Sequence, residues 1–364
     1  MNIRKTVPII LILLMFIFSI FSVNSQAQTP QSLYLNRVGF LNIEVGYDVH
    51  VVGDYAYVTN NEGLMIIDIQ DPSNPQKVGE LILGGALGFV IESNIAYIAS
   101  ASSGFVISNI SNPSNPQLLG QNSVGGALRV AVSGPCAYVT YVGAGFKIFN
   151  ISDLADPVLL GEYSDTRSDA IEIKENFAYF ANADVGLKVV DISNPSSPQL
   201  ITTISQTVGG NDIHITNNIL YLGCWGAGIR VIDISGPTTP QMLDSFDDND
   251  GGEELGVKEK DGLLYIADNS GVELFNVSVP TSIVEIAERT TDVSAAHDID
   301  VDEEYIYVAQ GGGLLILEVS TTPESDPWFI YLLIILAVFI AIAVISSVVY
   351  FKILKPRRVK KEEI

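Results

Sequence analysis

The stretch GLMIIDIQDPSNP, residues 63–75, decides the fold because the chain repeats it. It returns as GLKVVDISNPSSP at residues 186–198 and as GIRVIDISGPTTP at residues 228–240. Weaker copies are GFVISNISNPSNP at 104–116, GFKIFNISDLADP at 145–157, GVELFNVSVPTSI at 271–283 and GLLILEVS at 313–320. Self-similarity at a period of roughly 20 to 50 residues indicates a repeat architecture.

The repeat extends to the N-terminal side of this stretch. Each copy is preceded by an apolar segment with a central tyrosine, and these tyrosines are Tyr57, Tyr97, Tyr138, Tyr179, Tyr221, Tyr265 and Tyr307. The glycine that opens the stretch recurs as Gly63, Gly104, Gly145, Gly186, Gly228, Gly271 and Gly313. The spacing of 40 to 44 residues between tyrosines fits one propeller blade per copy.

Each unit predicts four short β-strands. In the first copy these are residues 48–52, 55–60, 64–69 and 77–83. Pro72 and Pro75 lie between the last two strands, and a turn suits them because proline fixes φ and donates no hydrogen bond. Nothing in the unit has a helical period. Four-stranded units of this kind are typical of the blades of an all-β propeller, whose inner strands are buried on both faces.

The ends of the repeat region predict how the ring closes. The seventh copy stops at Ser320 after three strands, whereas residues 33–43, LYLNRVGFLNI, resemble the fourth strand of the other copies. An N-terminal strand that completes the last blade leaves no exposed sheet edge. An open solenoid would need polar capping repeats at both ends, and the sequence has none. We therefore expect a seven-bladed β-propeller over residues 28–320, closed by an N-terminal strand.

Two apolar runs flank the predicted propeller. Residues 7–23 follow Arg4 and Lys5 and precede the small residues Ser25 and Ala27, a pattern that predicts a secretory signal peptide over residues 1–27. An uncleaved N-terminal anchor is the alternative, because the apolar run is long for a signal. Residues 328–351 carry no charge, and at about 1.5 Å per residue a helix of this length crosses a ~30 Å hydrocarbon core. We expect one transmembrane helix there, joined to the propeller by a stalk at residues 321–327.

The charge distribution predicts the orientation in the membrane and excludes one class of partner. Six of the 13 residues in the tail, 352–364, are basic, and positive charge stays on the cytoplasmic side. The sequence thus predicts a single-pass cell-membrane protein with an extracellular N-terminal domain and a cytoplasmic tail. The whole chain has a net charge of −23. Arg4 and Lys5 contribute two positive charges and the tail a net four, so the exported part alone has a net charge of −29. Such an acidic domain repels nucleic acid.

The quoted stretches resemble LVIVD repeats, a family of prokaryotic secreted and cell-surface proteins that form β-propellers. The resemblance covers residues 34–320. It implies a propeller fold, a surface location and a role in interaction, and it provides no catalytic residue to assign. The two cysteines, Cys136 and Cys224, lie at different repeat positions, which excludes a disulfide framework and a four-cysteine zinc site.

The inner strand of each blade lines the channel of a propeller, and its first residue is a natural place for a ligand. Around the ring these residues are Asp48, Gly88, Arg129, Ala170, Asp212, Glu254 and Asp298. Four carboxylates on one axis are oxygen ligands of the kind that Ca²⁺ prefers. The structural interpretation, which we favour, is that these aspartates bind backbone amides of a neighbouring blade. Arg129 would then neutralise part of the ring.

All three histidines of the chain, His50, His214 and His297, lie on predicted inner strands. Three imidazoles near one channel suggest a zinc site. Strand alternation can equally turn the rings into the packing between blades, and we favour that structural role.

Two further features concern the loops and turns. Residues 244–254 hold six carboxylates, of which Asp247, Asp248, Asp250 and Glu253 are candidate calcium ligands, with a solvated acidic loop as the alternative. Three N-x-S sequons are candidate glycosylation sites, at Asn109, Asn150 and Asn276. All three asparagines replace the aspartate of the repeated D-I-S, so drift of the repeat also explains them.

The sequence favours a binding module over an enzyme. It has no nucleophile elbow, Walker loop or H-E-x-x-H motif, and its loops vary more than its channel positions. We expect a surface scaffold that binds an extracellular protein or glycan. The alternatives are a propeller enzyme or cation-binding protein that uses the channel acids, and a subunit of a larger membrane complex. The face with Tyr141, Asp165, Trp225 and the acidic loop should point away from the membrane and carry the ligand site.

Overall fold

The computed structural model describes residues 32–226, 228–247 and 256–324. The expected signal peptide (1–27), transmembrane helix (328–351) and tail (352–364) lie outside these residues. No helix among the described residues is long and apolar enough to cross a membrane.

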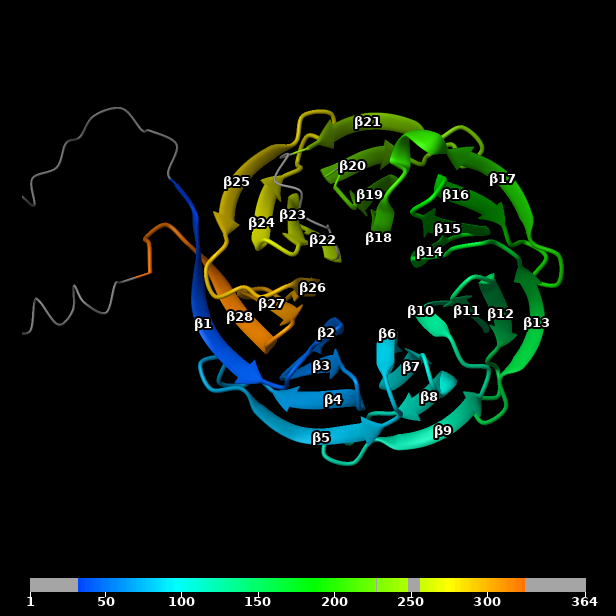
Figure 1. Ribbon diagram of the computed structural model, residues 1–364, viewed down its shortest axis with the longest axis horizontal. Helices are drawn as coiled ribbons and strands as arrows, with labels where there is room; N and C mark the ends of the chain where they lie inside the picture. The colour runs from blue at the N-terminus through cyan, green and yellow to red at the C-terminus, as the bar shows by residue number, and fades with distance from the viewer. Residues whose placement is uncertain (1–31, 227, 248–255, 325–364) are drawn as a thin grey trace, which may run out of the picture. The chain divides into compact units, whose positions relative to one another are not determined.

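Seven four-stranded antiparallel sheets make up the described part of the chain, arranged around a central axis (Figure 1). Blade one contains β2 (Asp48–Val52), β3 (Tyr55–Thr59), β4 (Gly63–Asp68) and β5 (Gln76–Ile82). Blade two contains β6 (Ala86–Glu92), β7 (Ile95–Ser100), β8 (Gly104–Asn109) and β9 (Gln117–Asn122). Blade three contains β10 (Ala127–Ser133), β11 (Cys136–Tyr141), β12 (Gly145–Asn150) and β13 (Val158–Tyr163). Blade four contains β14 (Ala170–Lys174), β15 (Phe177–Asn182), β16 (Gly186–Asp191) and β17 (Gln199–Ile204), followed by the short 3₁₀ helix η1 (Ser205–Thr207).

The remaining three blades continue around the ring. Blade five contains β18 (Gly210–Thr216), β19 (Ile219–Cys224), β20 (Gly228–Asp233) and β21 (Gln241–Phe246). Blade six contains β22 (Gly256–Lys260), β23 (Leu263–Ala267), β24 (Val272–Asn276) and β25 (Val284–Arg289). Blade seven contains β26 (Ala296–Val301), β27 (Tyr305–Gln310), β28 (Gly313–Ser320) and the N-terminal strand β1 (Tyr34–Asn42). The predicted seven-bladed β-propeller is therefore confirmed.

The N-terminal strand closes the ring as the sequence predicts. β1 pairs antiparallel with β28, from Tyr34 opposite Ser320 to Asn42 opposite Gly313. Figure 1 shows the first and last strands side by side at the same edge of the ring. The outer edge of β28 is thus covered, which removes an edge that could pair with another chain.

Seven hydrophobic clusters hold the described blades together, one at each seam between neighbours. The middle strands are apolar along their length because both faces of each sheet pack against another blade; in β4, for example, Leu64, Ile66 and Ile67 have no exposed surface. The seven repeated tyrosines are all buried. Both cysteines are buried and neither forms a disulfide.

A bulge in the outer strand explains a further repeated residue. In each blade the pairing of the third and fourth strands shifts by one residue. In blade one the shift skips Val78, and Gly79 directly follows it. A Cβ on Gly79 would lie 2.0 Å from the carbonyl oxygen of Pro113 in the turn of blade two. Gly39, Gly120 and Gly161 are similarly close to the turn of the following blade. In these four blades, glycine at this position therefore lets the turn of the next blade pack closely against the outer strand.

A buried arginine fastens the two ends of the propeller. Arg289, at the end of β25, donates from Nη1 to the Leu35 carbonyl at 2.7 Å and to Glu324 Oε2 at 3.0 Å. Its Nη2 donates to Asp292 at 3.3 Å. Leu35 belongs to the closing strand β1, and Glu324 follows β28. One side chain of blade six therefore binds both chain segments that meet in blade seven, the N-terminal strand and the end of the repeat region.

The two flat faces of the propeller differ in their loops. The connection face carries the loops between second and third strands and the links between blades, residues 60–62 and 83–85 in blade one and their equivalents. The turn face carries the other two sets of turns, residues 53–54 and 69–75 in blade one and their equivalents. Each inner strand runs from the connection face to the turn face.

Candidate functional site

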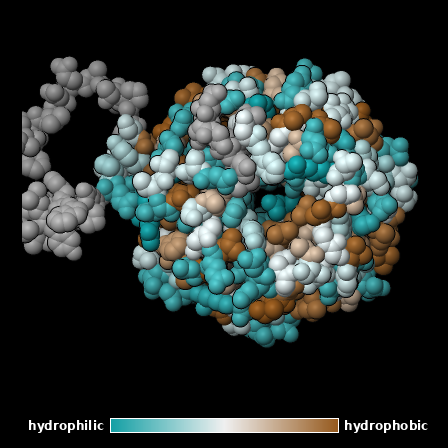
Figure 2. Space-filling view, viewed as in Figure 1, coloured by the Kyte–Doolittle hydropathy of each residue, from teal (hydrophilic) through white to brown (hydrophobic). Residues whose placement is uncertain are grey.

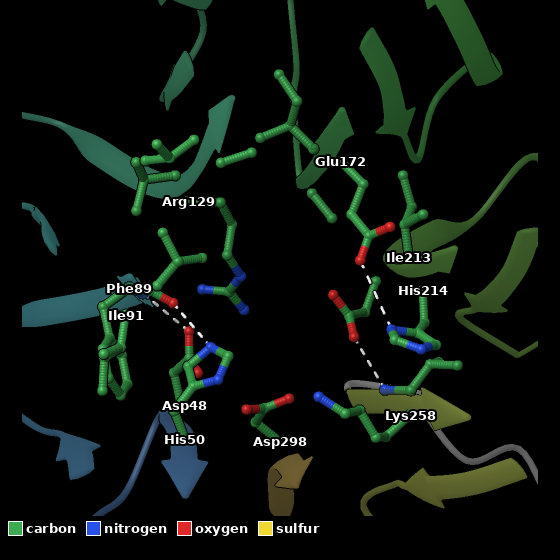
Figure 3. A pocket seen from close by; sticks show the side chains of 18 of the residues that line it. Asp48, His50, Phe89, Ile91, Arg129, Glu172, Ile213, His214, Lys258 and Asp298 are labelled. Atoms are coloured by element: carbon green, nitrogen blue, oxygen red, sulfur yellow. Dashed lines mark hydrogen bonds and ion pairs between the residues drawn. The ribbon is translucent and has the colours of Figure 1, made fainter. Parts of the chain in front are cut away.

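The central channel contains a cavity of about 430 Å³, lined by the inner strands of all seven blades. Figure 3 shows charged side chains that point into this opening from different strands, among them Arg129, Asp298, Glu172 and Lys258. A cavity of this volume with a few convergent polar groups is typical of a small-ligand site.

The first ring of the channel brings together most of the residues expected from the sequence. Asp48, Arg129, Asp212 and Asp298 all line the cavity. Glu254 lies outside the described residues. The matching position in blade six is Gly256, which lies opposite Ala267 just as Asp298 lies opposite Ala309.

The three aspartates of this ring bind the backbone of the next blade. Asp48 Oδ2 accepts from Phe89 N at 3.0 Å, Asp212 Oδ2 from Val257 N at 2.9 Å and Asp298 Oδ2 from Val49 N at 2.9 Å. This is the interaction that the structural interpretation predicts. Each carboxyl group therefore connects two blades at the seam and is fixed in direction by it.

Burial changes the acidity of these carboxyl groups. Burial and the negative charge of Asp298 raise the pKa of Asp212 to about 7. Burial and the adjacent Asp48, to which it is hydrogen-bonded, raise the pKa of Asp298 well above its usual range. Burial also raises the pKa of Asp48, although the positive charge of Arg129 opposes this.

A second ring of charged residues lies two positions deeper on the same strands. Lys258 Nζ pairs with Asp300 Oδ1 at 2.9 Å, and His214 Nδ1 lies 3.6 Å from Glu172 Oε1. His50 Nε2 lies 3.0 Å from the Phe89 carbonyl oxygen, and burial lowers the pKa of this imidazole.

The sequence prediction missed Glu172, Lys258 and Asp300. Alternate residues of a strand share a face, so the spacing of two from Ala170, Gly256 and Asp298 was the signal that would have found them.

Two of the histidines contact the backbone of the neighbouring blade, as the structural role predicts, although His50 and His214 also line the cavity. His50 on blade one reaches the backbone of blade two, and His297 Nδ1 on blade seven lies 2.7 Å from the Gly46 carbonyl oxygen beside blade one. Among the described residues, no group of three or more His, Cys, Asp or Glu side chains is placed to hold a metal ion.

The connection face carries a second group of the expected residues. The Arg167 guanidinium lies 4.7 Å from the ring centroid of Trp225, which is 37% exposed, and pairs with Asp169 at 2.9 Å and Asp184 at 3.4 Å. Asp165 is mostly buried, because it accepts from Asn182 Nδ2 and pairs with Lys188.

Tyr141 differs from its expected place on this face. It is only 3% exposed and packs into the seam between blades two and three. Within the described part of the chain its hydroxyl group has no hydrogen-bond partner, and burial raises its pKa to about 12. Tyr141 therefore contributes to the core and not to a surface.

The acidic loop and the sequons complete the expected features. Asp247 is exposed, whereas Asp248, Asp250 and Glu253 lie outside the described residues. The sequon asparagines end their strands, and each side-chain oxygen accepts from the amide two residues on, as Asn109 does from Ser111 at 2.9 Å. Asp191 and Asp233 make the same contact in other blades. Asparagine thus preserves the turn that the repeated aspartate forms.

The fold and the channel define a closed seven-bladed β-propeller with a polar centre. The model of the LVIVD repeat family matches residues 46–81, 84–123, 124–165, 167–205, 210–248 and 294–327. The chain belongs to this family. Blade six lies outside the matched residues, although it has the same four-stranded order as the others. No curated protein matches the chain.

Solved structures with a similar fold are remote in sequence. The β-propeller domain of Cps50 (Swd1) from Myceliophteria thermophila is 10% identical with a TM-score of 0.66, covering 79% of this chain and 100% of that one. The WD40 β-propeller domain of Doa1 is 13% identical with a TM-score of 0.62, covering 79% and 97%. The computationally designed Ika8 protein is 12% identical with a TM-score of 0.59, covering 78% and 99%. At these identities the likeness concerns the fold alone.

Proposed function

We propose that this protein is a cell-surface scaffold that binds an extracellular protein or glycan through its connection face. A β-propeller is in general a scaffold for protein interaction. The signal-peptide pattern at residues 1–27, the apolar run at 328–351 and the basic tail support a single-pass protein with the propeller outside the cell.

The observation that carries the proposal is a group of exposed apolar side chains in the loops of the connection face. Over blades three to five it comprises Val124, Val142, Val185, Val208 and Trp225, which are 37% to 67% exposed. In Figure 2, hydrophobic residues form the lower right rim of the central opening, over blade three. Exposed apolar groups next to polar ones are typical of interaction sites, and loops on a rigid scaffold are where such sites lie.

Trp225 is the residue best suited to anchor a partner. The Arg167 guanidinium lies over its indole ring and is itself held by Asp169 and Asp184. A ring that is fixed before binding loses little conformational entropy when a partner docks, and tryptophan and arginine are enriched among residues that dominate binding energy.

The test compares variants of the full-length protein in binding to intact cells and to a glycan array. We expect Trp225→Ala and Val142→Asp to lose the ligands that the wild-type protein binds. The matched control, Val279→Asp, changes a 55% exposed valine on the turn face and should retain them. Loss of binding in the control, with retention in the other two, would place the site on the opposite face.

The channel carboxylates give less support to an enzyme or a calcium-binding protein. Each of the three aspartates already uses one oxygen for a backbone amide, and Arg129 stands in the same ring and repels a cation.

A further inference from the structure

The first ring of the channel holds opposite charges that are not paired with one another. Asp48, Arg129, Asp212 and Asp298 all line the cavity. Within the described part of the chain, none of the four forms an ion pair within 4.0 Å. Lys258, two positions deeper, does find an acid in Asp300 at 2.9 Å. The first ring thus keeps Arg129 apart from the acidic side chains across an open space.

Small residues between the charged ones keep this space open. Gly88, Ala170 and Gly256 occupy the other three ring positions. A Cβ on Gly88 would lie 2.7 Å from Arg129 Cδ, and a Cβ on Gly256 would lie 2.6 Å from Asp298 Cα. Glycine at these positions gives Arg129 and Asp298 the room that they occupy.

Arg129 offers a guanidinium group to the cavity. Its one side-chain hydrogen bond within the described residues runs from Nη1 to the carbonyl oxygen of the preceding Leu128, at 3.4 Å. Figure 3 shows the group reaching into the opening. A planar guanidinium with several donors facing one way matches the two oxygens of a carboxylate.

Asp212 and Asp298 offer acceptors that are already fixed in place. Each holds a backbone amide of the next blade with Oδ2, which fixes the direction of the carboxyl group before a ligand arrives. Preorganised groups of this kind bind with a smaller loss of conformational entropy. The carboxyl oxygens of Asp212 and Asp298 can accept hydrogen bonds from a group with several N–H donors, such as an ammonium group.

The combination of the two signs selects among ligands. A simple cation is repelled by Arg129. An ammonium group that lies beside Asp212 and Asp298 favours their charged forms, because an opposite charge lowers the pKa of a carboxyl group. A molecule with both charges meets an opposite charge at each end. The cavity of about 430 Å³ has the size of a small-molecule site.

We propose that the central channel binds a small zwitterion of the α-amino-acid class, with its carboxylate on Arg129 and its ammonium group on Asp212 and Asp298. The ring lies at the connection-face end of the inner strands. Its residues are not among the exposed apolar side chains of that face, and the site does not depend on the function proposed for them. The propeller would then carry a small-molecule site at its centre and a macromolecular site on its surface.

The test measures the melting temperature and the calorimetric affinity of the full-length protein with each of the protein amino acids in turn. Methylamine and acetate, alone and together, serve as the separated charges. We expect at least one amino acid to raise the melting temperature in proportion to its occupancy, because a ligand of the folded state stabilises it. The separated charges should give no shift at the same concentration.

Two variants with matched controls test the assigned residues. Arg129→Gln and Asp212→Asn should each weaken the affinity by about tenfold or more. The asparagine in Asp212→Asn keeps an oxygen that accepts from Val257 N, so the fold should survive. Asp298→Asn is a second variant that tests the proposed binding of the ammonium group. In the control Arg230→Gln, the arginine makes the same bond to its preceding carbonyl, at 3.0 Å, on the third strand of blade five. In the control Asp244→Asn, the aspartate makes the same bond to the next blade, to Ile283 N at 2.9 Å, on an outer strand.

Both controls should bind like the wild-type protein. The proposal is overturned if no amino acid binds saturably up to ~10 mM, or if methylamine or acetate alone binds as well. It is also overturned if the control variants lose affinity together with the channel variants, because that result means a general loss of structure.

Discussion

Asp212 shows how burial changes the chemistry of a single carboxyl group in this propeller. It has the same backbone bond to the next blade as its neighbours in the ring, but burial and Asp298 raise its pKa to about 7. In the unfolded chain the pKa returns to its ordinary value of 3.8. The folded state therefore binds more protons than the unfolded state between these two values, and Asp212 makes folding less favourable as pH rises through this window.

Asp212→Asn should remove this dependence. Relative to the wild-type protein, the variant gains free energy of unfolding as pH rises from 4 to 7, by at most about 1.4 kcal/mol per pH unit. Urea unfolding of both proteins at several pH values in this window measures the difference. A difference that stays constant across the window would show that Asp212 has the same pKa in both states.

At the residue scale the sequence predicted part of the candidate site. Asp48, Arg129, Asp212 and Asp298 were placed in one ring because inner strands start at equivalent repeat positions. Glu254 was assigned instead of Gly256 because the period lengthens to 44 residues between Tyr221 and Tyr265, which obscures the register. The protonation of the aspartates could not be predicted, because it depends on the distance between side chains of different blades.

The outer strand of each blade is the element that joins it to the next turn. Gly79, at the bulge, has the Pro113 carbonyl oxygen where a Cβ would be. In blade five the equivalent residue is Asp244, which instead accepts from Ile283 N in the turn of blade six. In these two blades the position therefore either leaves room for the neighbouring turn or hydrogen-bonds to it.

Gly79→Ala should destabilise the propeller by about 1–3 kcal/mol, because the added methyl group forces the turn of blade two to move. The matched control is Gly312→Ala, whose Cβ would meet only Phe40 at 3.5 Å, an ordinary contact. This control should change stability by less than about 0.5 kcal/mol. Thermal or urea unfolding compares the two, and equal effects would mean that the contact with Pro113 relaxes without cost.

Arg289 connects the N-terminal strand β1 with the segment after β28. The sequence did not predict this contact. The partners of Arg289, Leu35 and Glu324, are far from it in the chain or outside the repeat, and a single arginine in an outer strand has no periodic signal. The closing strand itself was predicted, because residues 33–43 resemble a fourth strand and the seventh copy lacks one. Local pattern thus predicts which strands form, whereas contacts that occur once need coordinates.

Arg289→Ala should lower the free energy of unfolding by about 2–4 kcal/mol, because it removes buried charge-assisted hydrogen bonds to Leu35 and Glu324. The control Arg37→Ala changes an arginine that is 40% exposed and lies 3.8 Å from Asp292. An exposed pair of this kind contributes less than about 1 kcal/mol. Urea unfolding with limited proteolysis of the N-terminal segment measures both, and a larger effect of Arg37→Ala would contradict the role of Arg289.

For the whole molecule, ring closure and the proposed anchor together determine which face looks outward. β28 ends at Ser320, on the turn face, and only seven residues separate Ser320 from the expected transmembrane helix. An extended chain of this length reaches about 25 Å. We therefore expect the turn face to lie towards the membrane and the connection face to point away from it.

Single cysteines can test this orientation on intact cells. Val142→Cys lies on the connection face and Ser114→Cys in a proline turn on the turn face, and both positions are exposed. The natural cysteines are buried, so their background labelling should be low. A large impermeant maleimide should label Val142→Cys faster, and both at similar rates after detergent extraction. Faster labelling of Ser114→Cys on cells would reverse the orientation.

The pairing of β1 with β28 also has a mechanical consequence. In the blade-seven sheet β28 lies between β1 and β27, and the chain continues from it towards the proposed anchor. When a bound partner is pulled away from the cell, tension enters the propeller along β28. The force then acts along β28 as shear, and the hydrogen bonds that join it to β1 and to β27 bear the load together. A force that pulls the N-terminal segment and the end of β28 apart would instead peel β1 away one bond at a time, because Tyr34 lies opposite Ser320. The ring is thus expected to resist a pull along the axis of attachment better than a pull that separates Tyr34 from Ser320.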